Sequence, residues 1–316
     1  MSSVRYLQNI GVAYQDIKML DANQQLQYLA EIYLAHLKKF PYHNFELRTI
    51  SREHPVARTS LTFFTKWDEG IHGGYCYQSV HTLFHVLAEL DFNVSRGLGR
   101  VHAGLAINSK ALLSLPDTHV FIVANIQDQQ YLLDPGLSPS CPVAPLPIQP
   151  DGSLTEITQR NRLYRFRKHD EDTFVLERKI GEKWNPLFQT NLVMVKEKDI
   201  QFSMLKLERF PKKLGIRDTI LIIGIVTDTG SKSLFWSETS NGFAYAIENG
   251  SQYSKEVIQD PFKISCLLNT EFNIKHISTL DIESYCRKQK MPNPKQPWTV
   301  EFPLDNSELQ KLKANI

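Results

Sequence analysis

The pattern of apolar residues changes near Asp91, and this change is what most constrains the fold. Before it, residues 20–39 and 76–90 contain no proline or glycine and place apolar side chains three or four residues apart, which predicts two amphipathic helices. After it, short β-rich runs are separated by turn residues, which predicts an antiparallel meander or barrel. A helical region followed by strands indicates the α+β class. The predicted strands are residues 93–101, 104–108, 119–125, 131–133, 162–168, 174–180, 220–226, 234–237 and 243–248.

The chain of 316 residues is long enough for two or three packed modules. We expect a helical domain over residues 1–95, a β-barrel domain over 96–205, and a third domain of mixed helix and strand over 206–316. The third domain is predicted to contain a helix at 307–313.

Charge and hydropathy exclude several classes of function. With 36 basic and 34 acidic residues the net charge is only +2, which gives no reason to expect a nucleic acid or a membrane surface as partner. The longest apolar run, residues 220–226, is too short to span a bilayer, and the N-terminus lacks the apolar core of a signal peptide. We therefore expect a cytoplasmic protein that is a monomer or a weak homo-oligomer.

The segment Gly73-Gly74-Tyr75-Cys76 stands at the start of the second predicted helix. Glycines permit a close backbone approach, and a cysteine at a helix N-terminus lies at the positive end of the helix dipole, which favours the thiolate form. Cys76 is therefore a candidate nucleophile, with an inert buried cysteine as the alternative. The cysteines are too widely spaced for a disulfide framework or a zinc pair and lie at positions 76, 141, 266 and 286.

His119 and Asp134 stand at the two open ends of a predicted hairpin whose turn lies near residues 126–129. Antiparallel strands bring these ends together, and an aspartate beside a histidine can fix its tautomer and stabilise the imidazolium. If Cys76 faced this pair, the three residues would form a Cys–His–Asp triad. The alternative is a surface histidine and a turn aspartate, since the sequence pattern does not show that the hairpin faces the helix.

Other candidate sites carry weaker signals. His81 and His85 are four residues apart on one predicted helix, but without an HExxH motif or a third ligand they predict no metal site. Cys141 and Cys266 lack a helix start or a His/Asp partner and are interpreted as bystanders. No GxGxxG or GxxxxGK motif is present, so we expect neither ATP nor a dinucleotide, and no permanently bound cofactor.

Several short motifs, in order along the chain, resemble those of the arylamine N-acetyltransferase family. Residues 73–78 resemble its nucleophile motif RGGxCxE/Q, and residues 40–45 resemble its PFENL segment. The separation of 15 residues between His119 and Asp134 also matches the family. Further matching positions are Leu83-Phe84, Asp91-Phe92, Arg100-Val101, Thr118-His119 and Asp134-Pro135-Gly136-Leu137.

The resemblance covers residues 5–140 closely and continues more weakly to about residue 200. It implies a helical domain, an antiparallel β-barrel and an α/β lid, with a catalytic core related to papain-like and transglutaminase-like cysteine enzymes. It also implies ping-pong transfer of an acetyl group from the co-substrate acetyl-CoA, through acetyl-Cys76, to an arylamine, hydrazine or N-hydroxyarylamine. Its implied substrate-binding residues are Tyr75, Gly136, Leu137 and Phe45.

The chain departs from the family pattern at several positions. His72 replaces the arginine of the nucleophile motif, and Val80 replaces an asparagine. In the DVGFG motif, Pro135, Leu137 and Ser138 replace valine, phenylalanine and the second glycine. Leucine gives an aromatic amine more room but no ring face to stack on. The family's STHPxS segment, which helps to hold coenzyme A, has no clear counterpart. The basic residues in that part of the chain are interpreted as a charged surface and are Arg209, Lys212, Lys213 and Arg217.

Two other functions stay open at this point. A cysteine hydrolase or amide synthase could use the same catalytic core, and a hydrolase would differ in letting water reach the acyl-cysteine. A catalytically silent homologue that binds an acyl group or coenzyme A could keep the fold, although the presence of Cys76, His119 and Asp134 counts against it.

Overall fold

The computed structural model describes residues 2–45, 47, 73–149, 151–209, 221–237 and 242–288. The helix predicted at 307–313 lies outside this part of the chain. Also outside are His72, Lys212, Lys213, Arg217 and the side chains of Arg209 and Cys286.

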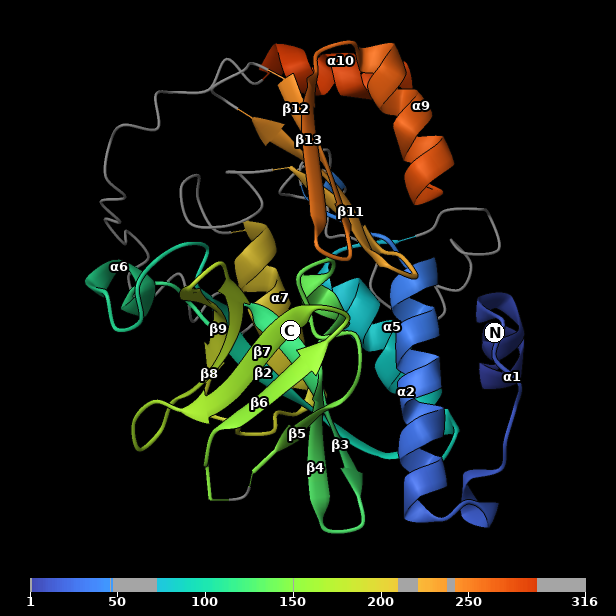
Figure 1. Cartoon of the computed structure of the whole chain (residues 1–316), viewed down its shortest axis with the longest axis vertical. Coiled ribbons are helices and arrows are strands. Elements are labelled where there is room, and N and C mark those ends of the chain that lie inside the picture. The colour runs from blue at the N-terminus through green and yellow to red at the C-terminus, as the bar shows by residue number, and fades with distance from the viewer. Residues whose placement is uncertain are drawn as a thin grey trace.

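Three helices form one side of the molecule: α1 (Ser3–Ile10), α2 (Ala22–Lys39) and α5 (Cys76–Glu89) (Figure 1). Both predicted long helices are confirmed. The start of α2 is defined by a reciprocal cap, in which Asp21 and Gln24 each accept the other's backbone N–H at 2.9 Å. Helix α5 is the central element, because its apolar residues pack against α1 on one side and against strands of a large sheet on the other.

The large sheet has eight antiparallel strands and curls until its two edges lie near each other, which makes an open barrel (Figure 1). Successive residues of one strand face opposite sides, so Phe121 points into the barrel while Val120 and Ile122 pack in the cluster around α5. From edge to edge the strands are β5 (Leu146–Ile148), β4 (Gln129–Leu133), β3 (His119–Ile126), β2 (Asn93–Val101), β9 (Lys183–Thr190), β8 (Phe174–Ile180), β7 (Arg162–Lys168) and β6 (Thr155–Gln159).

One predicted strand is wrong. Residues 104–108 form turns, because Ala103, Gly104 and Asn108 have positive φ angles of 47°, 85° and 61°. These angles are incompatible with an extended strand. The other predicted strands are confirmed where the structure describes them, although several extend beyond the predicted limits.

A second antiparallel sheet has five strands, and helices α9 (Pro261–Phe272) and α10 (Thr279–Lys288) pack in its apolar cluster (upper part of Figure 1). Its edge strand β1 comes from the first part of the sequence, where Tyr42 pairs with Gly224 of β10. The domain limits near residues 95 and 205 stay predictions. The strands in order are β1 (Tyr42–His43), β10 (Ile222–Val226), β11 (Gly230–Ser237), β12 (Gly242–Asn249) and β13 (Gln252–Ile258).

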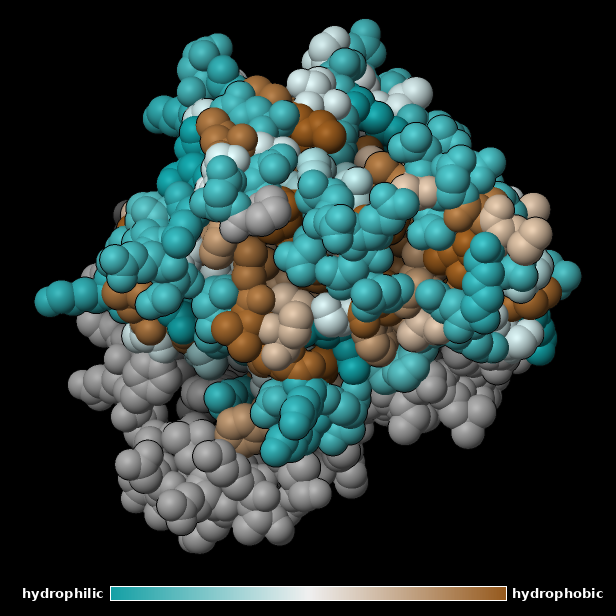
Figure 2. Space-filling view, turned by 90° about the horizontal axis from the view of Figure 1, so that it is seen from below, coloured by the Kyte–Doolittle hydropathy of each residue, from teal (hydrophilic) through white to brown (hydrophobic). Residues whose placement is uncertain are grey.

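Helix α7 (Glu197–Arg209) follows the last barrel strand in the chain and packs in the apolar cluster around α5. Among the described helices, none is long and apolar enough to cross a membrane. On the face seen from below, hydrophilic residues predominate and apolar residues gather in smaller groups between them (Figure 2). The remaining short elements are η1 (Ile17–Met19), α6 (Lys110–Leu113) and η2 (Pro135–Leu137).

Candidate active site

Cys76 is the first residue of α5, and the side chain of Gln78 sets this start. The Tyr75 N–H, just before the helix, donates to Gln78 Oε1 at 3.1 Å. A side chain at Gly74 would prevent this cap, because its Cβ would lie 2.2 Å from the same oxygen. The cap therefore requires glycine at position 74 and places the thiol of Cys76 at the positive end of the helix.

The segment just before Cys76 is hydrogen-bonded to β1 and to the residue before it. The His43 N–H donates to the Gly74 carbonyl at 3.0 Å, and the Gly74 N–H donates to the Pro41 carbonyl at 3.1 Å. Gly73 has a φ of +89°, and a Cβ there would lie 2.3 Å from the Pro41 oxygen. The two motifs at residues 40–45 and 73–78 are thus partners in space, which their separation in sequence does not reveal.

The hairpin of β3 and β4 brings His119 and Asp134 together as predicted. Its register pairs Ile122 with Leu133, and His119 Nε2 lies 2.8 Å from Asp134 Oδ2. The other carboxylate oxygen of Asp134 accepts the Gly136 N–H at 3.1 Å. Both oxygens of Asp134 are therefore engaged, which holds the carboxylate in one orientation toward the imidazole.

Tyr33 of α2 binds the backbone of Asp134, a role that the sequence pattern does not predict. Its hydroxyl accepts the Asp134 N–H at 3.1 Å and donates to the Pro142 carbonyl at 2.9 Å. Tyr33 occupies a helical-face position in the sequence that predicts a core residue and nothing more. Its second role follows only from the packing of α2 against the loop after β4.

Gly136 lies between Cys76 and the imidazole of His119. A Cβ at this position would lie 2.6 Å from Cys76 Cβ and 3.0 Å from His119 Cε1. Cys76, His119 and Asp134 are 6%, 2% and 1% exposed, so the three predicted residues are brought together in a site that is almost closed to solvent. Because Gly136 has no side chain, the backbone of η2 can pass directly beside the thiol.

The charges around His119 favour its protonated form. Burial alone lowers the pKa of His119, but the negative charge of Asp134, its hydrogen bond and a further hydrogen bond to Cys76 outweigh burial. The net effect raises the pKa of His119 to about 10. An imidazolium held beside a thiol stabilises the thiolate, which is the nucleophilic form of cysteine.

Two curated relatives align with much of this chain. One is the arylamine N-acetyltransferase / N-hydroxyarylamine O-acetyltransferase of Salmonella typhimurium, 27% identical over 54% of this chain and 57% of the relative. The other is the arylamine N-acetyltransferase of Escherichia coli, 23% identical over 80% of this chain and 85% of the relative. The first alignment thus spans little more than half of the relative's length.

The family model for N-acetyltransferases matches residues 25–279. The chain belongs to the arylamine N-acetyltransferase family. Its fold is also that of the Mycobacterium marinum arylamine N-acetyltransferase, with a TM-score of 0.75 at 22% identity over 91% of this chain and 99% of that one. The structure of the same enzyme in complex with CoA matches with a TM-score of 0.73 at 22% identity, over 90% and 97%.

The predicted substrate-binding residues of this N-acetyltransferase family member do not all lie together. Gly136 is beside Cys76, and Tyr75 directly precedes it, with its hydroxyl donating to Glu208 Oε1 at 2.8 Å. Leu137 is half-buried in η2 and packs against both the helical cluster and the barrel interior. Phe45 is buried in the separate cluster of the second sheet. Their roles toward substrate stay predictions.

The weaker candidate residues have other surroundings. The rings of His81 and His85 lie 4.2 Å apart, centroid to centroid. Within the described part of the chain, no group of three or more His, Cys, Asp or Glu side chains is placed to hold a metal ion. Burial raises the pKa of the Cys141 thiol to about 12, whereas Cys266 is exposed on α9.

We expect the His119–Asp134 pair to stabilise the fold most below about pH 6.5 and to lose this effect as the pH rises toward 10. The reason is that the folded-state pKa of His119 lies above its ordinary value of 6.5. The measurement is the free energy of unfolding in urea of wild type and Asp134→Asn at about pH 6, 8 and 9.5. The wild-type advantage should shrink by at most about 1.4 kcal/mol per pH unit. An advantage that stays constant or grows with pH contradicts this assignment.

Proposed function

We propose that this protein transfers an acetyl group from acetyl-CoA to an aromatic amine through an acetyl-cysteine on Cys76. The observation that carries the proposal is the buried cluster of Cys76, His119 and Asp134, in which the His119–Asp134 distance is 2.8 Å. Membership in the arylamine N-acetyltransferase family supports acetyl transfer as the reaction. The CoA complex of the M. marinum enzyme supports acetyl-CoA as co-substrate.

The first half-reaction begins with the thiolate of Cys76 beside the imidazolium of His119. The sulfur attacks the thioester carbonyl of acetyl-CoA, and the C–S bond to coenzyme A breaks as the tetrahedral intermediate collapses. The proton of His119 goes to the departing thiolate of coenzyme A, which leaves acetyl-Cys76 and a neutral imidazole. Asp134 keeps the ring in the orientation that both steps need.

The second half-reaction transfers the acetyl group to the acceptor. The nitrogen of a neutral arylamine, hydrazine or N-hydroxyarylamine attacks the carbonyl of acetyl-Cys76, and His119 takes the proton that the nitrogen loses. The thiolate–imidazolium pair is then restored. The closed surroundings of Cys76, which is 6% exposed, favour transfer over hydrolysis because water must be kept from the acyl-cysteine. A reactive thiol suits a reducing compartment, so we infer that the enzyme works in the cytoplasm.

The test incubates the purified protein with acetyl-CoA, with and without a panel of arylamines, and follows the release of free coenzyme A thiol. We expect release that depends on the amine, together with a mass increase of one acetyl group on the peptide that contains Cys76. Release at the same rate without amine would identify a hydrolase instead. No release and no acetyl-Cys76 would contradict acetyl transfer altogether and leave a silent binding homologue.

Leu137→Phe is expected to raise kcat/KM for a small arylamine about three- to tenfold. A phenylalanine ring would give the amine a stacking partner worth roughly 0.5–1.5 kcal/mol that leucine lacks. The rate of Cys76 acetylation by acetyl-CoA should not rise, since the amine takes no part in that step. Stopped-flow measurement of each half-reaction separates the two. An unchanged or slower second step would show that Leu137 does not line the acceptor site.

A further inference from the structure

Helix α7 is hydrogen-bonded to both residues that flank Cys76. The Tyr77 hydroxyl donates to Ser203 Oγ at 2.8 Å, and the Tyr75 hydroxyl donates to Glu208 Oε1 at 2.8 Å. All these side chains are buried. The first turn of α5, which carries the nucleophile, is therefore tied to α7 on both sides of the cysteine.

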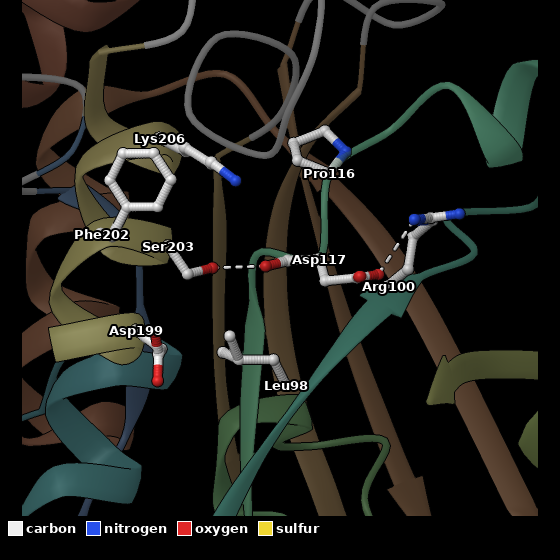
Figure 3. Close-up of a pocket in the computed structure, with 8 residues that line it drawn as sticks. All are labelled: Leu98, Arg100, Pro116, Asp117, Asp199, Phe202, Ser203 and Lys206. Atoms are coloured by element: carbon white, nitrogen blue, oxygen red, sulfur yellow. Dashed lines mark hydrogen bonds and ion pairs between the residues drawn. The ribbon is translucent and has the colours of Figure 1, made fainter. Parts of the chain in front are cut away.

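Ser203 also contacts the segment just before β3, the strand that carries His119. Its hydroxyl donates to the backbone carbonyl of Asp117, two residues before His119 (Figure 3). Arg100 holds the side chain of Asp117 in an ion pair of 3.1 Å. A single hydroxyl therefore accepts a hydrogen bond from the helix of Cys76 and donates one to the segment that leads into His119.

A pocket lies beside this hydrogen bond. About 420 Å³ of space lies between Phe202 and Ser203 of α7 on one side and Leu98 and Arg100 of β2 on the other (Figure 3). No side chain in the described part of the chain fills this space, so α7 and β2 are not closely packed beside the segment that leads into His119. At the edge of this space, the Ser203 hydroxyl donates directly to the Asp117 carbonyl and joins the two sides.

We propose that Ser203 is a positioning residue that sets the distance between Cys76 and His119. Its hydroxyl links Tyr77, next to the nucleophile, with Asp117, just before the imidazole. Without it, a buried hydroxyl loses its acceptor and a carbonyl loses a donor, so both segments shift to find other partners. The proposal rests on the proposed function in taking Cys76 and His119 as the reactive pair, and it does not depend on the acyl donor.

The test measures the rate of Cys76 alkylation by iodoacetamide against pH, with the modified peptide quantified by mass spectrometry. This readout needs neither acetyl-CoA nor an amine. Ser203→Ala should lower the rate at neutral pH about tenfold and shift the pH profile, because a displaced His119 no longer holds the thiolate. Ser203→Thr keeps the hydroxyl and should restore most of the rate.

Two further variants separate positioning from a purely structural role. Ser265→Ala is the matched control, because this serine of α9 also donates to a backbone carbonyl, that of Ile277 at 3.4 Å. It should leave the alkylation profile unchanged. Tyr77→Phe removes the donor to Ser203 and should lower the alkylation rate as Ser203→Ala does. The double variant of Ser203→Ala and Tyr77→Phe should be no slower than either single variant, because both changes break the same linkage.

Several results would overturn the proposal. In Ser203→Ala, a lower melting temperature with the wild-type alkylation profile would show that Ser203 is only structural. An equal loss in Ser203→Thr, or fully additive losses in the double variant with Tyr77→Phe, would also contradict it. If wild type fails to transfer acetyl groups but the alkylation results are as expected, the proposed function fails and the role of Ser203 stands.

Discussion

Cys76→Ala is expected to abolish acetyl transfer, with a loss on the order of 10⁴-fold or more. In the proposed mechanism the sulfur of Cys76 carries the acetyl group, and His119 and Asp134 serve the reactions at that sulfur. Cys76→Ser should be nearly as inactive because a hydroxyl is a far weaker nucleophile than a thiolate. His119→Ala should cost about as much, and combining it with Cys76→Ala should add little, since the two residues work as a unit.

The control for this prediction is Cys266→Ala, since Cys266 is exposed on α9 and belongs to a different part of the fold. It should keep wild-type kcat/KM. Thermal unfolding of Cys76→Ala should stay close to that of wild type, which would show that the loss is chemical. If Cys76→Ala kept more than about a hundredth of the rate, another residue would have to be the nucleophile.

Gly136→Ala is expected to slow the acetylation of Cys76 about 100-fold without removing any functional group. The added methyl would lie 2.6 Å from Cys76 Cβ and 3.0 Å from His119 Cε1, so the two residues must move apart. A displacement near 1 Å between reacting groups costs about two orders of magnitude in rate. Single-turnover acetylation by acetyl-CoA measures this step directly.

Gly242→Ala in β12 is the control for Gly136→Ala, because the added methyl is crowded to a similar degree but lies away from Cys76 and His119. Its Cβ would lie 2.9 Å from the Ile258 carbonyl oxygen and 3.0 Å from Gln259 Cγ, and neither atom belongs to the cluster of Cys76, His119 and Asp134. This variant should lose stability to a similar degree and still acetylate Cys76 at close to the wild-type rate. Equal rate losses in both variants would mean that Gly136 acts through global stability and not through the geometry of Cys76 and His119.

Local sequence signals predicted those elements whose pattern repeats within one segment. The helices at residues 20–39 and 76–90 have a continuous apolar face, and α2 also has the Asp21–Gln24 cap. The predicted strand at 104–108 is wrong because Gly104 and Asn108 adopt positive φ angles, which turn the chain. The alternation of apolar residues does not reveal such backbone angles. Helices α7, α9 and α10 were not predicted, since their apolar faces became evident only against the surfaces that they cover.

The sequence by itself predicted the α+β class, the place of Cys76 at a helix start and the pairing of His119 with Asp134. Each of these depends on residues close in sequence: glycines next to a helix, or the two ends of one hairpin. Only the tertiary structure decided that the hairpin faces Cys76 and that the Tyr33 hydroxyl binds the backbone N–H of Asp134. It also decided that Ser203 is hydrogen-bonded both to Tyr77 and to Asp117. Those contacts join segments far apart in the chain, where no local propensity or periodicity specifies which surfaces meet.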